Sequence, residues 1–277
     1  MSWIFGVAMQ MQARPNKIHG PKTQLLEFGQ LLALILVNRG LLDINENVAT
    51  YWPEFAANDR ETSALKLAEE FQDLEKSTAR LAEQPPWYVP GSQSAYTGSI
   101  YGHLVGELVR RITGKLLSQF IAEEITTPLG ADFQIGLPEE EWPRCADIIP
   151  FSLDKMVPLT ALDPTSILGR VLQGSLVYPT IPNKPVFRKS ENGAMAGFSN
   201  ARALARIGSL VSLESIIPLI PEEDGICFWS GYGGSMVIMD RRRQMTIAYI
   251  MNKLEYRLSS NSNFDAYFPE IYKGFDG

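Results

Sequence analysis

The chain has 277 residues and 45% of them are hydrophobic, so it can bury a sizeable core as one large domain or two small ones. Its formal net charge of −6 gives no electrostatic reason to expect a nucleic-acid partner. Its two cysteines, Cys145 and Cys227, are too few for a disulfide framework, which favours a reducing compartment such as the cytoplasm. With only His19 and His103, and no Cys/His cluster, we expect neither a zinc site nor a cofactor.

The apolar N-terminal segment, residues 3–9, is expected to form a strand. It lacks the basic leading region of a signal peptide, and polar sequence rather than a small-residue cleavage site follows it. The longest apolar run, residues 31–37, is much shorter than the roughly 20 residues of a membrane span. We therefore expect no signal peptide and no membrane span.

The remaining elements follow from the spacing of apolar residues. Thr23 is a good N-cap for a helix that continues to about Arg39 and ends at Gly40. Further helices are expected over residues 61–83, 101–113, 116–125, 163–175, 201–213 and 264–272. Short strands are expected over residues 226–228, 236–239 and 246–251. Helices combined with an antiparallel C-terminal sheet indicate a layered α+β protein.

A tyrosine lies between a Pro/Gly-rich turn and an amphipathic helix. Pro90 and Gly91 predict a turn followed by a surface loop that contains Tyr96. On such a rigid turn Tyr96 either presents a fixed hydroxyl group to a cleft or packs on the surface. His103 falls at a polar position of the following helix, where we expect it to be solvated and without a role.

This arrangement is similar to the second motif of the β-lactamase-related serine hydrolases, in which a tyrosine helps to move the proton of a Ser-x-x-Lys nucleophile. Further segments resemble that family in the same order, namely residues 39–58, 127–138, 192–193 with 200–206, and 228–252. The family includes class C β-lactamases, penicillin-binding proteins, family VIII carboxylesterases and fungal transesterases.

The resemblance implies a fold of the β-lactamase/transpeptidase type, an α+β architecture with an antiparallel sheet flanked by helices. Residues 1–277 would form one domain, with a helical part over about 23–213. The N-terminal strand over 3–9 and the C-terminal strands over 226–251 would form the sheet. Family members have further strands before the nucleophile helix, so we expect a fold reduced at its N-terminus, with an exposed sheet edge. A truncated gene model, a genuinely reduced fold or a partner chain that covers this edge in a homo- or hetero-oligomer would each explain the difference.

The family's nucleophile and its lysine are one helical turn apart, so that the amine can take the hydroxyl proton. The family's spacing places the nucleophile at Thr23 and the lysine at Leu26, which cannot accept a proton. Thr23 is otherwise explained as a helix cap. A literal Ser-x-x-Lys string, Ser63 to Lys66, lies near an expected helix start but at a different place in the family's order, and another begins at Ser152 in a Pro-rich loop.

Trp229, Ser230 and Gly231 resemble the family's third motif. At these three positions, family members that recognise carboxylates carry Lys-Thr-Gly. The tryptophan removes a fixed positive charge, which favours a neutral ester or hydrophobic natural product over an acidic β-lactam. We expect these residues and Tyr232 to contact a substrate. Alternatively, Trp229 is a core aromatic residue and the glycines around it form a turn.

Three hypotheses follow from the resemblance. The first is a degenerate esterase- or transesterase-like protein of secondary-metabolite biosynthesis, which binds a hydrophobic ester or natural product or transforms it with Tyr96 as general acid or base. The second is a non-catalytic partner or scaffold protein. The third is an active esterase or acyltransferase that uses Thr23 or Ser63 as its nucleophile.

Overall fold

The structure is a computed structural model of the 277-residue chain. It describes residues 5–8, 23–26, 29–56, 73–85, 87, 100–152, 163–167, 169–170, 180–212, 225–231, 234–255 and 262–276. For the segments before residue 31 it describes the backbone.

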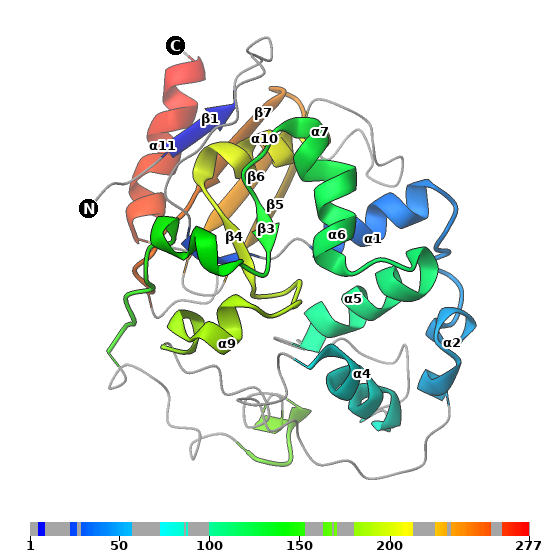
Figure 1. Ribbon diagram of the computed structural model, residues 1–277. Helices are drawn as coiled ribbons and strands as arrows, with labels where there is room; N and C mark the ends of the chain where they lie inside the picture. Colours follow the sequence, from blue (N-terminus) through cyan, green and yellow to red (C-terminus); the bar gives the residue numbers. More distant parts are fainter. Residues whose placement is uncertain are drawn as a thin grey trace.

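The larger of two sheets has four antiparallel strands in the order β1-β7-β6-β5 (Figure 1). These strands are β1 (Phe5–Ala8), β5 (Ile226–Ser230), β6 (Met236–Asp240) and β7 (Met245–Tyr249). The N-terminal strand pairs with the last strand, with Phe5 opposite Tyr249. The α+β class predicted from the sequence is confirmed, with an antiparallel sheet between helices.

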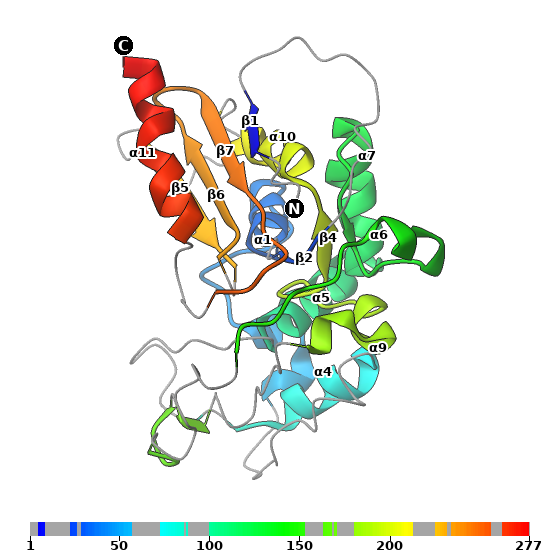
Figure 2. The same cartoon turned by 90° about the vertical axis from the view of Figure 1, so that its left-hand side faces the viewer.

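Helices cover both faces of this sheet. Helix α10 (Ala201–Ser212) lies on one face and helix α11 (Ser262–Asp276) on the other, as Figure 2 shows. Because side chains alternate along a strand, Met239 packs in the core on the α10 side and Tyr249 packs with Phe264 of α11. This double cover explains why every residue of β6 and β7 is buried.

The smaller sheet contains strand β2 (Thr23–Leu26), which corrects one prediction. It has the order β2-β4-β3, with β3 at Gln134–Ile135 and β4 at Gly197–Ser199. The expected helix from Thr23 is therefore wrong at its start, since helix α1 runs over Gly29–Asn38. Intrinsic helix preferences differ by less than about 1 kcal/mol per residue, so pairing with β4 can outweigh them.

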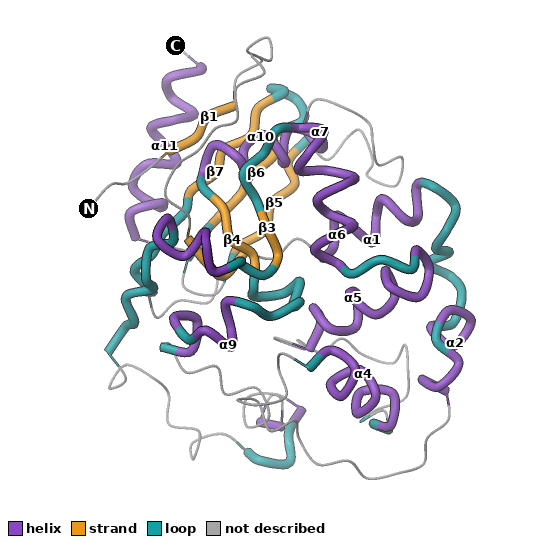
Figure 3. Tube along the Cα trace, viewed as in Figure 1, coloured by secondary structure: helices purple, strands orange, loops and turns teal. Residues whose placement is uncertain are grey.

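The other described helices lie on the side of the larger sheet away from α11 (Figure 3). They are α2 (Val48–Tyr51), α4 (Leu74–Glu83), α5 (Ile100–Thr113), α6 (Leu117–Ile121), α7 (Thr127–Leu129) and α9 (Pro185–Arg188), with a π-helical turn at Ala122–Thr126 and 3-10 turns at Pro53–Ala56, Glu139–Arg144 and Ile181–Asn183. No described helix has both the length and the apolar composition that crossing a bilayer requires.

Several predicted helix ends are confirmed. Gly40 and Gly114 follow α1 and α5 with φ angles of 66° and 72°, a left-handed conformation that glycine adopts without steric cost. The predicted helices over 101–113 and 201–213 match α5 and α10. Parts of the helices expected over 61–83 and 163–175 lie outside the described residues.

Helix α5 packs closely against the loop that precedes β4. A methyl group on Gly102 would lie 2.5 Å from Asn192 Oδ1 and 2.7 Å from the backbone nitrogen of Gly193. The Asn192 side chain is fixed, because its Oδ1 accepts hydrogen bonds from the backbone N–H groups of Ala194 at 2.9 Å and Met195 at 3.1 Å. Only a residue without a side chain fits at position 102.

We therefore predict that Gly102→Ala lowers the free energy of unfolding by about 3 kcal/mol, since the loop must move to admit the methyl group. Urea unfolding followed by circular dichroism measures the change. Gly274→Ala is the matched control, because no atom lies within 4 Å of the added methyl group on α11. The control should be neutral or stabilising by up to about 1 kcal/mol, and an equal loss in both variants would contradict the close contact.

Candidate functional site

Trp229 and Ser230 lie at the end of β5, which forms one edge of the larger sheet. Trp229 pairs with Val237 and Ser230 with Met236 across the β5–β6 hairpin. The Trp229 side chain is half-buried and packs against the core that includes Val237. The indole therefore combines a core position with a partly exposed surface at the open edge of the sheet.

Gly231 and Gly234 take part in the turn of this hairpin. The N–H of Gly231 donates to the carbonyl oxygen of Ser235 at 2.8 Å, and the N–H of Gly234 donates to the carbonyl oxygen of Gly231 at 3.0 Å. Gly234 has a φ of 109°, which favours glycine. The sequence analysis considered substrate contact and turn formation for this segment. Gly231 and Gly234 form a turn, and the N–H of Gly231 is already hydrogen-bonded within it.

Helix α1 follows the positions at which the family's spacing places the nucleophile and its lysine. Its sequence, GQLLALILVN, contains neither a hydroxyl group nor an amine. Leu32 and Leu36 have 0% exposure and pack in the main core. Any pair of residues one turn apart on this helix therefore lacks the proton acceptor that covalent catalysis requires.

Thr23 and Leu26 lie on strand β2, opposite Ser199 and Gly197 of β4. A strand rises about 3.3 Å per residue, so the two positions are about 10 Å apart along it rather than one helical turn apart. Thr23 is therefore not a helix cap, and the pair does not have the geometry of a nucleophile and its lysine.

Four other predicted site residues, Tyr96, Tyr232, Ser63 and Lys66, lie outside the described residues. Their roles stay predictions. Helix α5, which follows Tyr96, begins at Ile100.

The prediction that His103 is solvated is wrong, since only 1% of its surface is exposed. Burial lowers its pKa from the ordinary 6.5 to about 4. Glu107, one turn further along α5, is also buried. Burial raises the pKa of its carboxyl, but hydrogen bonds from Arg110 and Arg111 outweigh burial and hold that pKa below its usual value. Helix α5 therefore buries polar groups on a face that a simple periodicity argument assigns to solvent.

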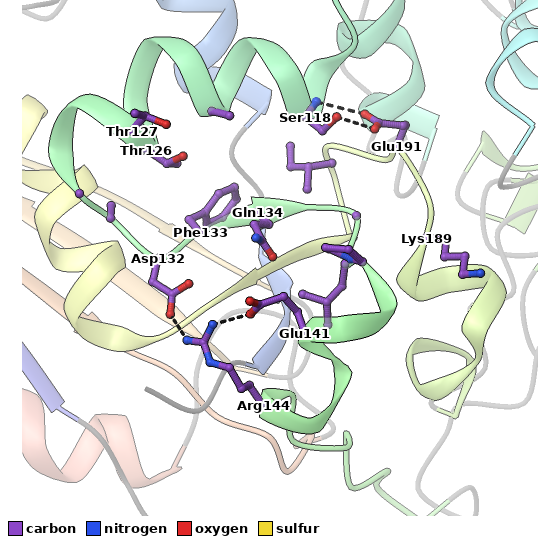
Figure 4. Close-up of a pocket in the computed structure, with 17 residues that line it drawn as sticks. Ser118, Thr126, Thr127, Asp132, Phe133, Gln134, Glu141, Arg144, Lys189 and Glu191 are labelled. Atoms are coloured by element: carbon purple, nitrogen blue, oxygen red, sulfur yellow. Dashed lines mark hydrogen bonds and ion pairs between the residues drawn. The ribbon is translucent and has the colours of Figure 1, made fainter. Parts of the chain in front are cut away.

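The sequence analysis missed a second group of polar side chains, around a pocket beside β3 (Figure 4). Ser118 and Glu191 hydrogen-bond across 73 residues of sequence. Arg144 forms ion pairs with both Asp132 and Glu141. No local motif marks the pair Ser118 and Glu191 or the pair Arg144 and Asp132, because each pair joins different segments of the chain. Only the pair Arg144 and Glu141 lies within one turn.

Comparison with known proteins identifies the family. A family model described as Beta-lactamase matches residues 28–267. The chain belongs to the β-lactamase family. The resemblance to β-lactamase-related serine hydrolases is thus confirmed, and the matched region begins at the residue before helix α1.

The relatives of this β-lactamase-family chain include esterases. The esterase/β-lactamase LipL of Mycobacterium tuberculosis is 29% identical over 248 residues, which cover 80% of this chain and 56% of that protein. The chain thus spans little more than half the length of that relative. A family VIII carboxylesterase structure is 24% identical with a TM-score of 0.75, covering 91% of this chain and 83% of the other. EstA from Arthrobacter nitroguajacolicus Rue61a is 23% identical with a TM-score of 0.73, covering 95% and 88%. The two structural matches show the shared fold.

Because His103 is neutral in the folded state and its unfolded pKa is near 6.5, the unfolded chain binds more protons between about pH 6.5 and 4. The contribution of His103 to stability is therefore present above that window and falls as the pH drops through it. We predict that, between pH 7 and pH 4, the free energy of unfolding falls by about 3 kcal/mol more in the wild-type protein than in His103→Gln. Urea unfolding at a series of pH values measures both proteins. Parallel stability profiles would contradict the burial of the imidazole.

Proposed function

We propose that this member of the β-lactamase family binds a hydrophobic, uncharged ester or natural product without forming an acyl-enzyme through a Ser-x-x-Lys couple. One observation carries the proposal: helix α1 contains no serine, threonine or lysine, while Thr23 and Leu26 lie on a strand. Without a hydroxyl group and an amine one turn apart, the proton transfer that activates the nucleophile has no acceptor. In this account the protein retains the fold of an acyl-transfer enzyme and has lost its covalent step.

The expected ligand is neutral because of Trp229. The indole lies at the end of the edge strand, at the position where carboxylate-binding members carry a lysine, and it offers apolar surface rather than a positive charge. The esterase activity in the name of LipL supports an ester as the ligand class. We assign Ser230 and Tyr232 to the same binding site.

Tyr96 is the remaining candidate for chemistry on the bound ligand. An ordinary phenol has a pKa of about 10, so a general acid or base at this position needs a neighbour that lowers or matches that value. In our proposal such a protein acts in secondary-metabolite biosynthesis, on a hydrophobic intermediate. Residues 1–277 act as one domain in this proposal.

Two experiments test the two parts of the proposal. The purified chain is treated with a fluorophosphonate and analysed by intact mass and peptide mapping, beside an active carboxylesterase of the family as positive control. We expect no adduct on this chain, because neither α1 nor β2 offers a hydroxyl group with an amine one helical turn away. In parallel, titration calorimetry with p-nitrophenyl butyrate should show binding, and Trp229→Lys should weaken it about tenfold through loss of apolar contact.

Trp87→Lys is the matched control, because Trp87 is 39% exposed and stacks with Arg170 instead of packing on β6. An adduct mapped to Thr23 or Ser63 would overturn the proposal in favour of an active esterase. If neither butyrate ester nor fluorophosphonate binds, the protein is better described as a non-catalytic partner or scaffold. Equal ester binding by Trp229→Lys and the wild type would remove Trp229 from the site.

A further inference from the structure

Strand β5 lies at one edge of the larger sheet and is paired on one side only. Figure 2 shows it at the end of the row of four strands, next to β6. The N–H of Arg241 donates to the carbonyl oxygen of Gly225 at 2.6 Å, and the N–H of Gly231 donates to that of Ser235 at 2.8 Å. Residues that hydrogen-bond to one neighbour alternate along an antiparallel strand. The odd-numbered residues of β5 therefore face β6, and the even-numbered residues face away from it.

The outer side of β5 presents both backbone groups and apolar side chains. The backbone N–H and C=O groups of Ile226, Phe228 and Ser230 point outward, and no described strand pairs with them. The side chain of Phe228 is 67% exposed and that of Ile226 is 48% exposed. Both lie on the α11 face of the sheet, because Phe228 pairs with Ile238, which packs in the core beneath that helix.

This edge lacks the features that normally keep exposed strands from pairing with other chains. Its sequence, ICFWS, contains neither a charged residue nor a proline. Arg242 lies at one end of the strand, since a methyl group on Gly225 would be 2.6 Å from its Nε. If two β5 strands paired antiparallel, the two arginines would lie at opposite ends, about 20 Å apart. Salt screens charges beyond about 8 Å, so these like charges would not oppose the pairing.

We propose that the protein forms a two-fold symmetric dimer in which the β5 strands of two copies pair antiparallel, centred on Phe228. In this register Ile226 of each copy lies opposite Ser230 of the other, so every outward-facing backbone group of β5 has a partner. The two Phe228 side chains lie side by side on one face of a continuous sheet. Registers centred on Cys227 or Trp229 pair fewer of these groups, so β5 is most complementary to itself in the first register.

The size of the contact makes the dimer weak and dependent on concentration. The exposed parts of Phe228 and Ile226 amount to about 200 Å² of apolar surface on each copy. A standard interface buries about 800 Å² per partner, so strand pairing must supply much of the contact. We therefore expect a dissociation constant of about 10–100 μM.

Sedimentation velocity of the full chain from about 5 to about 200 μM brackets this constant and should show monomer converting to dimer, with no larger species. Phe228→Lys should keep the chain monomeric over the same range, because it places two ammonium groups directly opposite each other. Ile44→Lys is the matched control, because Ile44 is 63% exposed and lies outside β5. The control should dimerise as the wild type does.

A mixture of two variants tests whether β5 pairs with itself. Phe228→Lys and Phe228→Glu should each be monomeric alone, and mixing them should restore the dimer, since opposite charges then meet at the two-fold axis. Restored association is specific to a residue that lies opposite its own copy. A mixture that stays monomeric would contradict the register.

A disulfide measures the register independently. In the dimer Trp229 lies opposite Cys227 of the second copy, in a non-hydrogen-bonded pair whose Cα atoms are about 4.5 Å apart. Trp229→Cys should therefore form an intermolecular disulfide with Cys227 when oxidised by copper phenanthroline, as peptide mapping would show. Trp87→Cys, also exposed but outside β5, should form none. That the second copy places Cys227 beside the ester site rests on the proposed function, whereas the dimer does not.

Three results would overturn the inference. They are a wild-type chain that is monomeric at every concentration, dimerisation of Phe228→Lys equal to that of the wild type, and a disulfide that joins residues other than 227 and 229. In the first case the edge would be left to an extended peptide or another partner. Species larger than a dimer would contradict closure around a two-fold axis.

Discussion

The pairing of strand β2 with β4 decides where the first large helix can begin. Thr23 lies opposite Ser199 and Leu26 opposite Gly197, so residues 23–26 are extended and helix α1 starts at Gly29. Positions 23 and 26, where the family's spacing places the nucleophile and its lysine, then lie on a strand, and the helix that follows carries no charged residue. The pairing thus sets the backbone geometry of the two positions on which the proposed function depends.

The core explains how this fold is stable independently of the chemistry of its site. Leu32 and Leu36 of α1 pack against Val105 and Val109 of α5, and the same core continues to α10 and the inner face of the large sheet. Burying apolar side chains stabilises the structure whether or not a serine or lysine is present. A member of the family can therefore lose its nucleophile and keep the arrangement of helices and sheet.

Local rules predicted the elements that depend on local chemistry. Gly40 and Gly114 end helices because they adopt positive φ, and short apolar runs after Gly225 predicted the C-terminal strands. Residues whose state depends on distant partners were not predictable in the same way. Thr23 forms a strand because it pairs with Ser199 of β4, which lies 176 residues later in the sequence.

The candidate site likewise contains some residues that local sequence predicted and others that depend on distant partners. The resemblance of Trp229 and Ser230 to a family motif located the edge strand, since that motif is local. Burial of His103 was missed because the helix packs against more than one neighbour, so its polar positions do not all face water. The pair Ser118 and Glu191 was missed because only the folded chain brings the two together.

The most direct measurement is the backbone conformation of Thr23–Leu26 in solution. Carbon chemical shifts and cross-strand nuclear Overhauser effects from labelled protein report it without any assumption about activity. This account predicts extended-strand shifts for all four residues and contacts between Thr23 and Ser199. Helical shifts that continue from Thr23 into α1 would contradict it, because Thr23 and position 26 would then lie one turn apart on the nucleophile helix.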